Sequence, residues 1–187
     1  MSPRRKIIAQ LATSADGFIA RPDGDFEWLN GFQGTGDYGM KSFYASIDTV
    51  PWGRKTYENA VAYHLKHGID RDVFDTSLTI YVFARRPAER TATGATFVSE
   101  PVKTFAARLR SAPGTHIGMM GGSELIASFL DAGELDELDL HVFPIFIGEG
   151  IPLVAPRHRE LLLRTLSAKK FSDGVVRMRY EIPRGEL

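Results

Sequence analysis

The chain lacks cysteine, lacks a net charge and lacks a long apolar run, and each absence excludes a class of protein. Without cysteine it cannot form a disulfide, a cysteine-ligated zinc site or a reactive thiol, and it is compatible with a reducing compartment. Its 23 Lys and Arg residues balance 23 Asp and Glu residues, so its overall charge favours neither nucleic acid nor an anionic membrane as a partner. The first apolar run, Ile7 to Ala12, is too short for a signal peptide or a membrane span, so we expect a cytoplasmic protein.

The length of 187 residues suits one domain, residues 1–187, whose core needs neither disulfides nor metal. Early strand-like runs alternate with helix-like runs, and the last two strands are joined by a turn at Asp173-Gly174. We therefore expect an α/β fold with a mostly parallel sheet, an antiparallel C-terminal hairpin and helices on both faces. The predicted strands span residues 6–13, 48–52, 78–84, 96–98, 115–120, 138–143, 162–171 and 175–182, and the predicted helices span residues 38–47, 54–65, 101–111 and 123–132.

Two glycine-anchored junctions each connect a strand-like run to a helix-like run. They are Gly53-Arg54-Lys55-Thr56-Tyr57-Glu58 and Gly121-Gly122-Ser123-Glu124-Leu125. A helix N-terminus offers unpaired N–H groups and the positive end of a dipole, so two such ends facing one groove could bind the two phosphates of a dinucleotide. A solvated basic turn and a tightly packed strand-helix junction are the alternative interpretations.

Arg85 and Arg86 follow the strand predicted over residues 78–84. Beside Arg54 they would suit an extra phosphate, such as the 2′-phosphate of NADPH, although either one alone is also typical of an exposed surface arginine. A literal G-x-G-x-x-G occurs at residues 34–39, but no strand directly precedes it. We interpret it as a loop rather than a dinucleotide fingerprint.

In their order along the chain, four segments resemble the dihydrofolate reductase-like superfamily, and specifically the reductase domain of the bifunctional riboflavin-biosynthesis deaminase-reductase and its stand-alone relatives. The resemblance covers nearly the whole chain. It implies a three-layer fold with a central sheet of about eight strands and NADPH bound across the carboxyl edge of that sheet. The segments are Leu11 to Ala20, Gly53 to Glu58, Gly121 to Leu125 and Pro144 to Leu153.

The resemblance also implies which residues hold the cofactor. Ala12, Asp16 and Ile19 would lie along the nicotinamide, and Gly53, Arg54, Lys55 and Thr56 would hold the adenosine phosphates. Arg85 and Arg86 would lie on the 2′-phosphate side, and Gly121, Gly122, Ser123 and Glu124 would hold the pyrophosphate.

Two positions depart from the family pattern. Pro51-Trp52 stands where an aliphatic residue and methionine are usual, and Ala84 stands where a hydroxyl residue is common. Because Pro51 has no amide hydrogen to give to a ladder, we expect its strand to be an edge strand or an irregular one.

Hydride transfer is the chemistry of the cofactor, so few catalytic residues are required. The resemblance makes Asp37 a candidate for binding and protonating a substrate ring, because dihydrofolate reductases bind the pteridine with a carboxylate at the matching separation from the Gly-Arg turn. The alternative is that Asp37 caps the following helix. His141, on the strand predicted over residues 138–143, is the second candidate, and the alternative is a structural histidine. Trp28, Phe43 and Tyr44 could line a substrate ring or belong to the core.

We therefore expect an NADPH-dependent reductase of a small heterocyclic substrate. The first candidate substrate is 5-amino-6-(5-phosphoribosylamino)uracil, of riboflavin biosynthesis, and the second is a dihydropterin or dihydrofolate. The alternative from another class is an NADP(H)-binding module without turnover. No nucleic-acid, membrane or metal partner is expected. We also expect a homodimer, because the segment from Pro144 to Leu153 is more apolar than a solvent-facing loop, and the resemblance implies pairing through the late strands. The alternative is that this segment packs on the core.

Overall fold

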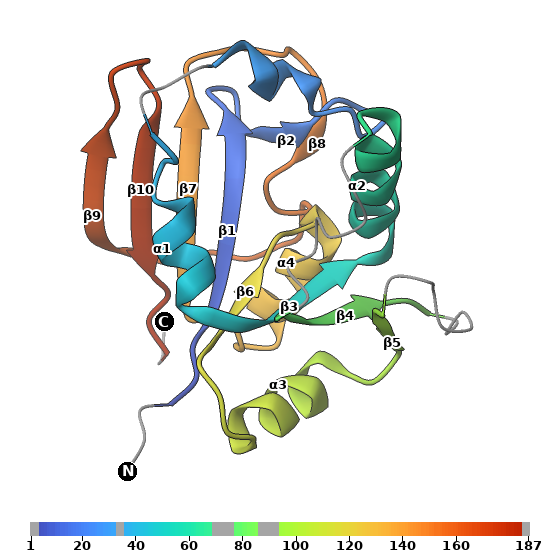
Figure 1. Ribbon diagram of the computed structural model, residues 1–187. Coiled ribbons are helices and arrows are strands. Elements are labelled where there is room, and N and C mark those ends of the chain that lie inside the picture. Colours follow the sequence, from blue (N-terminus) through green and yellow to red (C-terminus); the bar gives the residue numbers. More distant parts are fainter. Residues whose placement is uncertain (1–3, 33–35, 69–76, 86–93, 185–187) are drawn as a thin grey trace.

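An eight-stranded sheet in the order β5-β4-β3-β6-β1-β7-β10-β9 runs through the centre of the molecule (Figure 1). The computed structural model describes residues 4–32, 36–68, 77–85 and 94–184. The strands of this sheet are β1 (Ile7–Ser14), β3 (Ile47–Gly53), β4 (Thr79–Phe83), β5 (Thr96–Val98), β6 (His116–Met119), β7 (Glu137–Phe143), β9 (Arg164–Lys170) and β10 (Val176–Glu181). The helices are α1 (Met40–Ala45), α2 (Arg54–Lys66), α3 (Val102–Ser111) and α4 (Ser123–Asp131), with a 3₁₀ turn η1 (Glu27–Gly31).

The directions of the strands confirm the predicted α/β architecture. The strands from β5 to β7 in the sheet order pair in parallel, whereas β10 is antiparallel to both β7 and β9. A second, two-stranded sheet pairs β2 (Phe18–Ala20) with β8 (Ile151–Pro152). The sequence did not predict η1, β2 or β8, because segments of two to five residues are too short to show a periodicity.

The side-chain alternation of β1 separates the two layers of core on either side of the sheet. Ile7, Ala9 and Leu11 belong to the main cluster with buried residues of α3 and α4. Ile8 points the other way and packs in a second cluster with Phe43 of α1. In Figure 1, α1 and α2 accordingly lie on the near side of the sheet and α4 lies behind it. The alternation of side chains between the two faces of the sheet therefore produces three layers, with the sheet between two layers of helices.

A row of buried charges crosses the β7–β10 pair. Glu137 and Asp139 of β7 are 3% and 1% exposed. The Arg177 Nε donates to Asp139 at 2.8 Å, and Glu137 accepts from Arg179 at 2.8 Å and from Lys6 at 2.6 Å. Burial alone would raise the pKa of Glu137, but its bonds to Lys6 and Arg179 lower it below the usual value. The pairing satisfies charges that would otherwise be very costly to bury.

Pro51 lies inside the sheet, so the prediction of an edge strand is wrong and the prediction of an irregular one is confirmed. β3 lies between β4 and β6, and its pairing with β6 shifts register between Ile47 and Thr49. The next bond toward β6 is donated by Gly53 to the Gly121 oxygen at 3.1 Å. Because successive strand residues face opposite neighbours, the Pro51 nitrogen faces β6, as the Gly53 amide does. It lies between the Thr49 pairing and the Gly53–Gly121 bond, where no amide hydrogen is needed.

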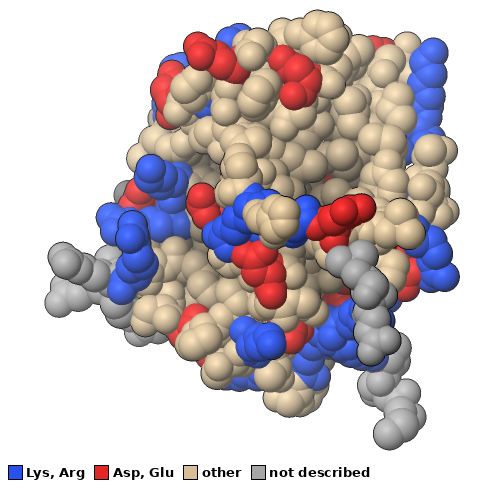
Figure 2. Space-filling model, turned by 180° about the vertical axis from the view of Figure 1, so that it is seen from behind, with Lys and Arg blue, Asp and Glu red and all other residues tan. Residues whose placement is uncertain are grey.

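The space-filling view of the opposite face shows blue and red atoms interspersed over a broad tan surface (Figure 2). No helix among the described residues is long and apolar enough to cross a membrane. In the same described ranges, no three His, Asp or Glu side chains are grouped so that they could hold a metal ion.

We predict that Gly118→Ala destabilises the fold by about 1–3 kcal/mol, because a new methyl group in a packed core forces its neighbours to move. A Cβ on Gly118 would lie 2.5 Å from the Ile47 Cδ1 atom and 2.8 Å from the Phe43 Cζ atom, and both side chains are buried. Urea unfolding measures the effect. Gly31→Ala is the control, because nothing lies within 4 Å of a Cβ there. Equal midpoints for Gly118→Ala and the wild type would contradict the packing described here.

Candidate functional site

The two glycine junctions meet at the carboxyl ends of β3 and β6. The Gly53 amide donates to the Gly121 oxygen at 3.1 Å, and a Cβ on Gly53 would lie only 3.3 Å from the Gly122 nitrogen. α2 begins directly after Gly53 and α4 directly after Gly122. The structure therefore brings the N-termini of both helices to one place, and their dipoles make that place favourable for an anion.

Where the two helices begin, hydrogen-bond donors are present and there is too little room for side chains larger than glycine at Gly122. Neither N-cap residue, Gly53 or Gly122, makes a side-chain capping bond to its helix. A Cβ on Gly122 would lie 2.5 Å from the Thr56 Oγ1 atom, so only glycine fits there without movement. Ser123 is 6% exposed, and its hydroxyl oxygen has no hydrogen-bond partner among the described residues. A buried, unpartnered hydroxyl beside two uncapped helix starts fits a phosphate-bearing group.

The charged residues expected to hold the cofactor differ in their contacts near the two glycine junctions. Arg54 is exposed and donates to Glu58 at 2.7 Å, and Lys55 is exposed beside it. Arg85 is exposed two residues after Phe83, which pairs with Gly53, so Arg54 and Arg85 both follow the ends of adjacent strands. Glu124 bonds to Arg157 at 2.8 Å. Arg86 lies outside the described residues.

Asp16 joins two loops at the nicotinamide end of the predicted site. Its carboxylate accepts from the Gly148 amide at 2.8 Å and from the Ile147 amide at 3.2 Å. A bond from Ser14 and these backbone bonds lower the pKa of Asp16, so it stays ionised. Ala12 is half-buried in β1, and Ile19 in β2 packs against the main core cluster. Asp16 thus positions the loop after β1.

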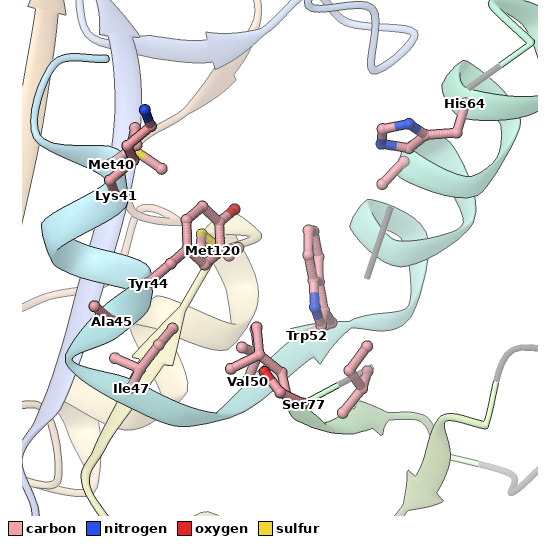
Figure 3. A pocket seen from close by; sticks show the side chains of 13 residues that line it. Met40, Lys41, Tyr44, Ala45, Ile47, Val50, Trp52, His64, Ser77 and Met120 are labelled. Atoms are coloured by element: carbon pink, nitrogen blue, oxygen red, sulfur yellow. The ribbon is translucent and has the colours of Figure 1, made fainter. Parts of the chain in front are cut away.

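A cavity of about 840 Å³ adjoins the glycine junctions (Figure 3). α1 borders it on one side, α2 on the other, and β3 lies between them. Trp52 and Met120, which directly precede Gly53 and Gly121, both line it, so a ring bound in the cavity would lie next to the junctions. The lining residues are Met40, Lys41, Tyr44, Ala45, Ile47, Val50, Trp52, Ala60, His64, Ser77, Leu78, Ile80 and Met120.

Of the three aromatic residues proposed from the sequence to contact a substrate, only Tyr44 lines the cavity. Phe43 belongs to the core beneath α1, and Trp28 packs edge-on against Phe143 in another cluster. In the sequence, Trp52 stands out only as a departure from the family pattern, and His64 is not among the predicted site residues. The position of Trp52 directly before Gly53 was a usable signal, whereas nothing local marks His64.

Asp37 does not belong to the cavity lining, and its carboxylate caps the start of α1. It accepts from the Lys41 amide at 2.7 Å and from the Gly39 amide at 3.0 Å. These two backbone bonds lower the pKa of Asp37. The geometry is that of the capping alternative, and a role in ring binding stays a prediction.

His141 is 3% exposed and also lies outside the cavity lining. Its Nε2 lies 3.0 Å from the Tyr38 carbonyl oxygen, and its Nδ1 lies 3.1 Å from the side-chain nitrogen Nε2 of Gln10. Because a carbonyl only accepts, Nε2 carries the proton and Nδ1 accepts from Gln10. Burial lowers the pKa of His141, which keeps the ring neutral. The contacts describe a structural histidine, and its catalytic role stays a prediction.

The chain is similar to members of one protein family over nearly all of its length. The sequence model of the RibD C-terminal domain matches residues 5–177. The YwjB protein of Bacillus subtilis (strain 168) is 38% identical over 172 residues, which cover 91% of this chain and 95% of that protein. The YyaP protein of the same strain is 31% identical over 182 residues, which cover 95% of each.

Solved structures share the fold at low sequence identity. A protein from Shewanella sp. PV-4 named for riboflavin biosynthesis superposes with a TM-score of 0.83 at 22% identity, covering 96% of this chain and 99% of that one. The dihydrofolate reductase of Enterococcus faecalis, solved with NADP(H), gives a TM-score of 0.67 at 17% identity, with coverage of 96% and 97%. The Thermotoga maritima deaminase/5-amino-6-(5-phosphoribosylamino)uracil reductase also gives 0.67 at 17%, covering 96% of this chain and 57% of that one.

The structure predicts that His141 makes stability depend on pH. Burial lowers its folded-state pKa below the usual value of 6.5 for a histidine. The unfolded chain therefore binds the proton first as the pH falls, so the stability from neutral His141 is full above about pH 6.5 and declines below it. We expect urea unfolding at about pH 7.5 and pH 5.5 to show a smaller loss of stability for His141→Gln than for the wild type. An identical loss in both proteins would contradict this assignment.

Proposed function

The chain belongs to the RibD C-terminal domain family, and we propose that it is an NADPH-dependent reductase of a small heterocyclic substrate. The observation that supports this most is the meeting of two uncapped helix starts beside a cavity of about 840 Å³. A dinucleotide needs the first feature for its phosphates, and a substrate ring needs the second.

The two glycine junctions would hold the cofactor. The first-turn amides of α2 and α4 would bind the phosphates, Thr56 and the free Ser123 hydroxyl would add donors, and Gly122 would leave the space. When bound, NADPH supplies the hydride. The similar fold of a dihydrofolate reductase solved with NADP(H) supports this choice of cofactor.

The preference for the phosphorylated cofactor is assigned to Arg54 and Arg85, with Arg86 a further candidate from the sequence. Arg54 and Arg85 are exposed and follow the carboxyl ends of the adjacent strands β3 and β4. Charge-assisted contacts to a 2′-phosphate from exposed arginines contribute modestly, because water and salt screen them.

The substrate would bind in the cavity between α1 and α2. The first candidate is 5-amino-6-(5-phosphoribosylamino)uracil, which the Thermotoga protein is named for reducing, and a dihydropterin or dihydrofolate is the second. The alternative from another class is an NADP(H)-binding module without turnover, which Trp52 favours if its indole fills the place of the nicotinamide. Oxidation of NADPH in the presence of these substrates distinguishes the reductase from the module. The cytoplasm remains the proposed location.

We predict that the protein binds NADPH about tenfold more tightly than NADH, because exposed charge-assisted bonds contribute roughly 1 kcal/mol. Calorimetry measures both affinities. Arg85→Ala should bring the two values closer. Gly122→Ala should weaken both by about tenfold or more, because its methyl group meets the Thr56 hydroxyl, whereas Gly31→Ala should change neither. Equal affinities of the wild type for NADPH and NADH would refute the cofactor assignment.

We also propose that the protein is a homodimer, and its exposed residues favour the late strands over the loop from Pro144 to Leu153 as the interface. Ile145 and Ile147 pack against the cluster around Trp28, and Phe146 is the strongly exposed apolar residue of that loop at 78%. A larger set of exposed leucines lies on β9 and the segment before it, at the edge of the sheet. These are Leu161, Leu162, Leu163 and Leu166, which are 41%, 83%, 36% and 43% exposed.

We expect light scattering to give the mass of a dimer at tens of micromolar protein. Exposed leucines on an edge strand would be buried between two copies, so Leu162→Asp combined with Leu166→Asp should give a monomer. Phe146→Asp is the matched control and should remain dimeric. If the wild type is a monomer at that concentration, the proposal is wrong, and if only Phe146→Asp separates the subunits, the interface is the loop.

A further inference from the structure

The cavity between α1 and α2 is lined mainly by apolar side chains, and those of Met40, Tyr44, Trp52 and Met120 are flat or flexible. Tyr44 and Trp52 lie on different sides of its opening in Figure 3, and Met40 and Met120 add unbranched thioethers. Methionine adapts its shape to a neighbouring ring, and aromatic faces stack on one. The lining therefore suits a planar ring better than a branched or fully hydrated group.

Trp52 is supported from behind by other aromatic side chains. Its ring makes an edge contact with the ring of Tyr57 at 6.5 Å between centroids, and Tyr57 in turn contacts Phe97 at 6.3 Å. Tyr57 is only 3% exposed, so it cannot move aside easily. Trp52 also packs against the two clusters on either side of it. These contacts fix the indole, while its own half-exposed surface borders the cavity.

The cavity has little with which to bind a phosphate. Lys41 is the one charged side chain among the described lining residues. His64 lines the far side, and burial lowers its pKa, so it is neutral at pH 7. The first amides of α1 are taken by the Asp37 carboxylate, whose negative charge would repel an anion. A phosphate monoester carries roughly two negative charges and is usually bound by arginine or by free backbone amides.

We infer that Trp52 holds the planar heterocyclic ring of the substrate and that the described lining residues of the cavity add little affinity for a phosphate on it. The inference rests on the proposed reductase function, in that the cavity is taken as the substrate side of the site. It assigns Trp52 as the residue that determines ring specificity, and it separates this chain from a reductase that depends on a phosphoribosyl group.

The chain offers a direct test, because it contains only two tryptophans. Trp28 is 8% exposed in a cluster away from the cavity, so Trp28→Phe leaves Trp52 as the single fluorescent reporter. This variant is titrated in the presence of saturating NADP⁺, which occupies the proposed phosphate site at the glycine junctions. The titrants are 5-amino-6-(ribosylamino)uracil, its 5′-phosphate and pterin. We expect quenching of Trp52 by at least one unphosphorylated ring, and affinities for the phosphorylated and unphosphorylated pyrimidine that agree within about fivefold.

Two outcomes overturn the inference. One is a phosphorylated form that binds more than about fivefold more tightly than its unphosphorylated counterpart. The other is the absence of quenching by all three rings.

Variants at position 52 test its role by calorimetry with the same rings. Trp52→Ala should weaken ring binding by about tenfold or more, whereas Trp52→Phe should retain most of it, because a phenyl ring still stacks. Binding of NADPH should stay within about threefold of the wild type in Trp52→Phe, which shows that the neighbouring junction is intact. Equal ring affinity in Trp52→Ala and the wild type overturns the assignment of Trp52.

The test separates this inference from the proposed function. Quenching of Trp52 by an unphosphorylated ring without any oxidation of NADPH would refute the reductase and leave the ring site standing. Oxidation of NADPH with the phosphorylated pyrimidine alone would support the reductase and refute the inference.

Discussion

The close approach of Gly53 to Gly121 and Gly122 is the contact on which the candidate site depends. A single hydrogen bond of 3.1 Å between the Gly53 amide and the Gly121 oxygen holds the two junctions together. A side chain at Gly53 or Gly122 would meet backbone or the Thr56 hydroxyl. Because the junctions touch, α2 and α4 start from one place, and no side chain caps either helix there.

The same approach explains why β3 tolerates proline in the interior of the sheet. β3 and β6 pair only near their starts, with a shift of register between Ile47 and Thr49, and then join again at the Gly53–Gly121 bond. The gap between them removes the need for an amide hydrogen at Pro51. It also separates Trp52 from a regular ladder on that side, so the residue directly before the junction borders the cavity. One local irregularity thus serves the sheet and the site.

Buried polar groups fix the pairing of β7 with β10, in the half of the sheet away from the glycine junctions. Asp139, Glu137 and His141 lie on one face of β7, with partners from β1, β10 and the segment before β1. Their net contribution to stability is small, because desolvation offsets attraction, but they require one register between β7 and β10. In this arrangement His141 supports the frame, and Asp37 supports the start of α1.

The order of the elements, the parallel and antiparallel parts of the sheet and the two glycine junctions could all be predicted from the sequence. Each depends on a local signal: a period of two or of 3.6, a turn at Asp173-Gly174, or glycine before a helix. The sequence could not predict the partners of Asp37 and His141. Nor could it predict the interior position of β3 or the cavity between α1 and α2. Those features depend on contacts between residues far apart in the chain, such as His141 with Tyr38 and Tyr57 with Phe97. Only the folded chain decides which side of a strand meets which neighbour, because local patterns give the face of a residue and not the group that lies opposite it.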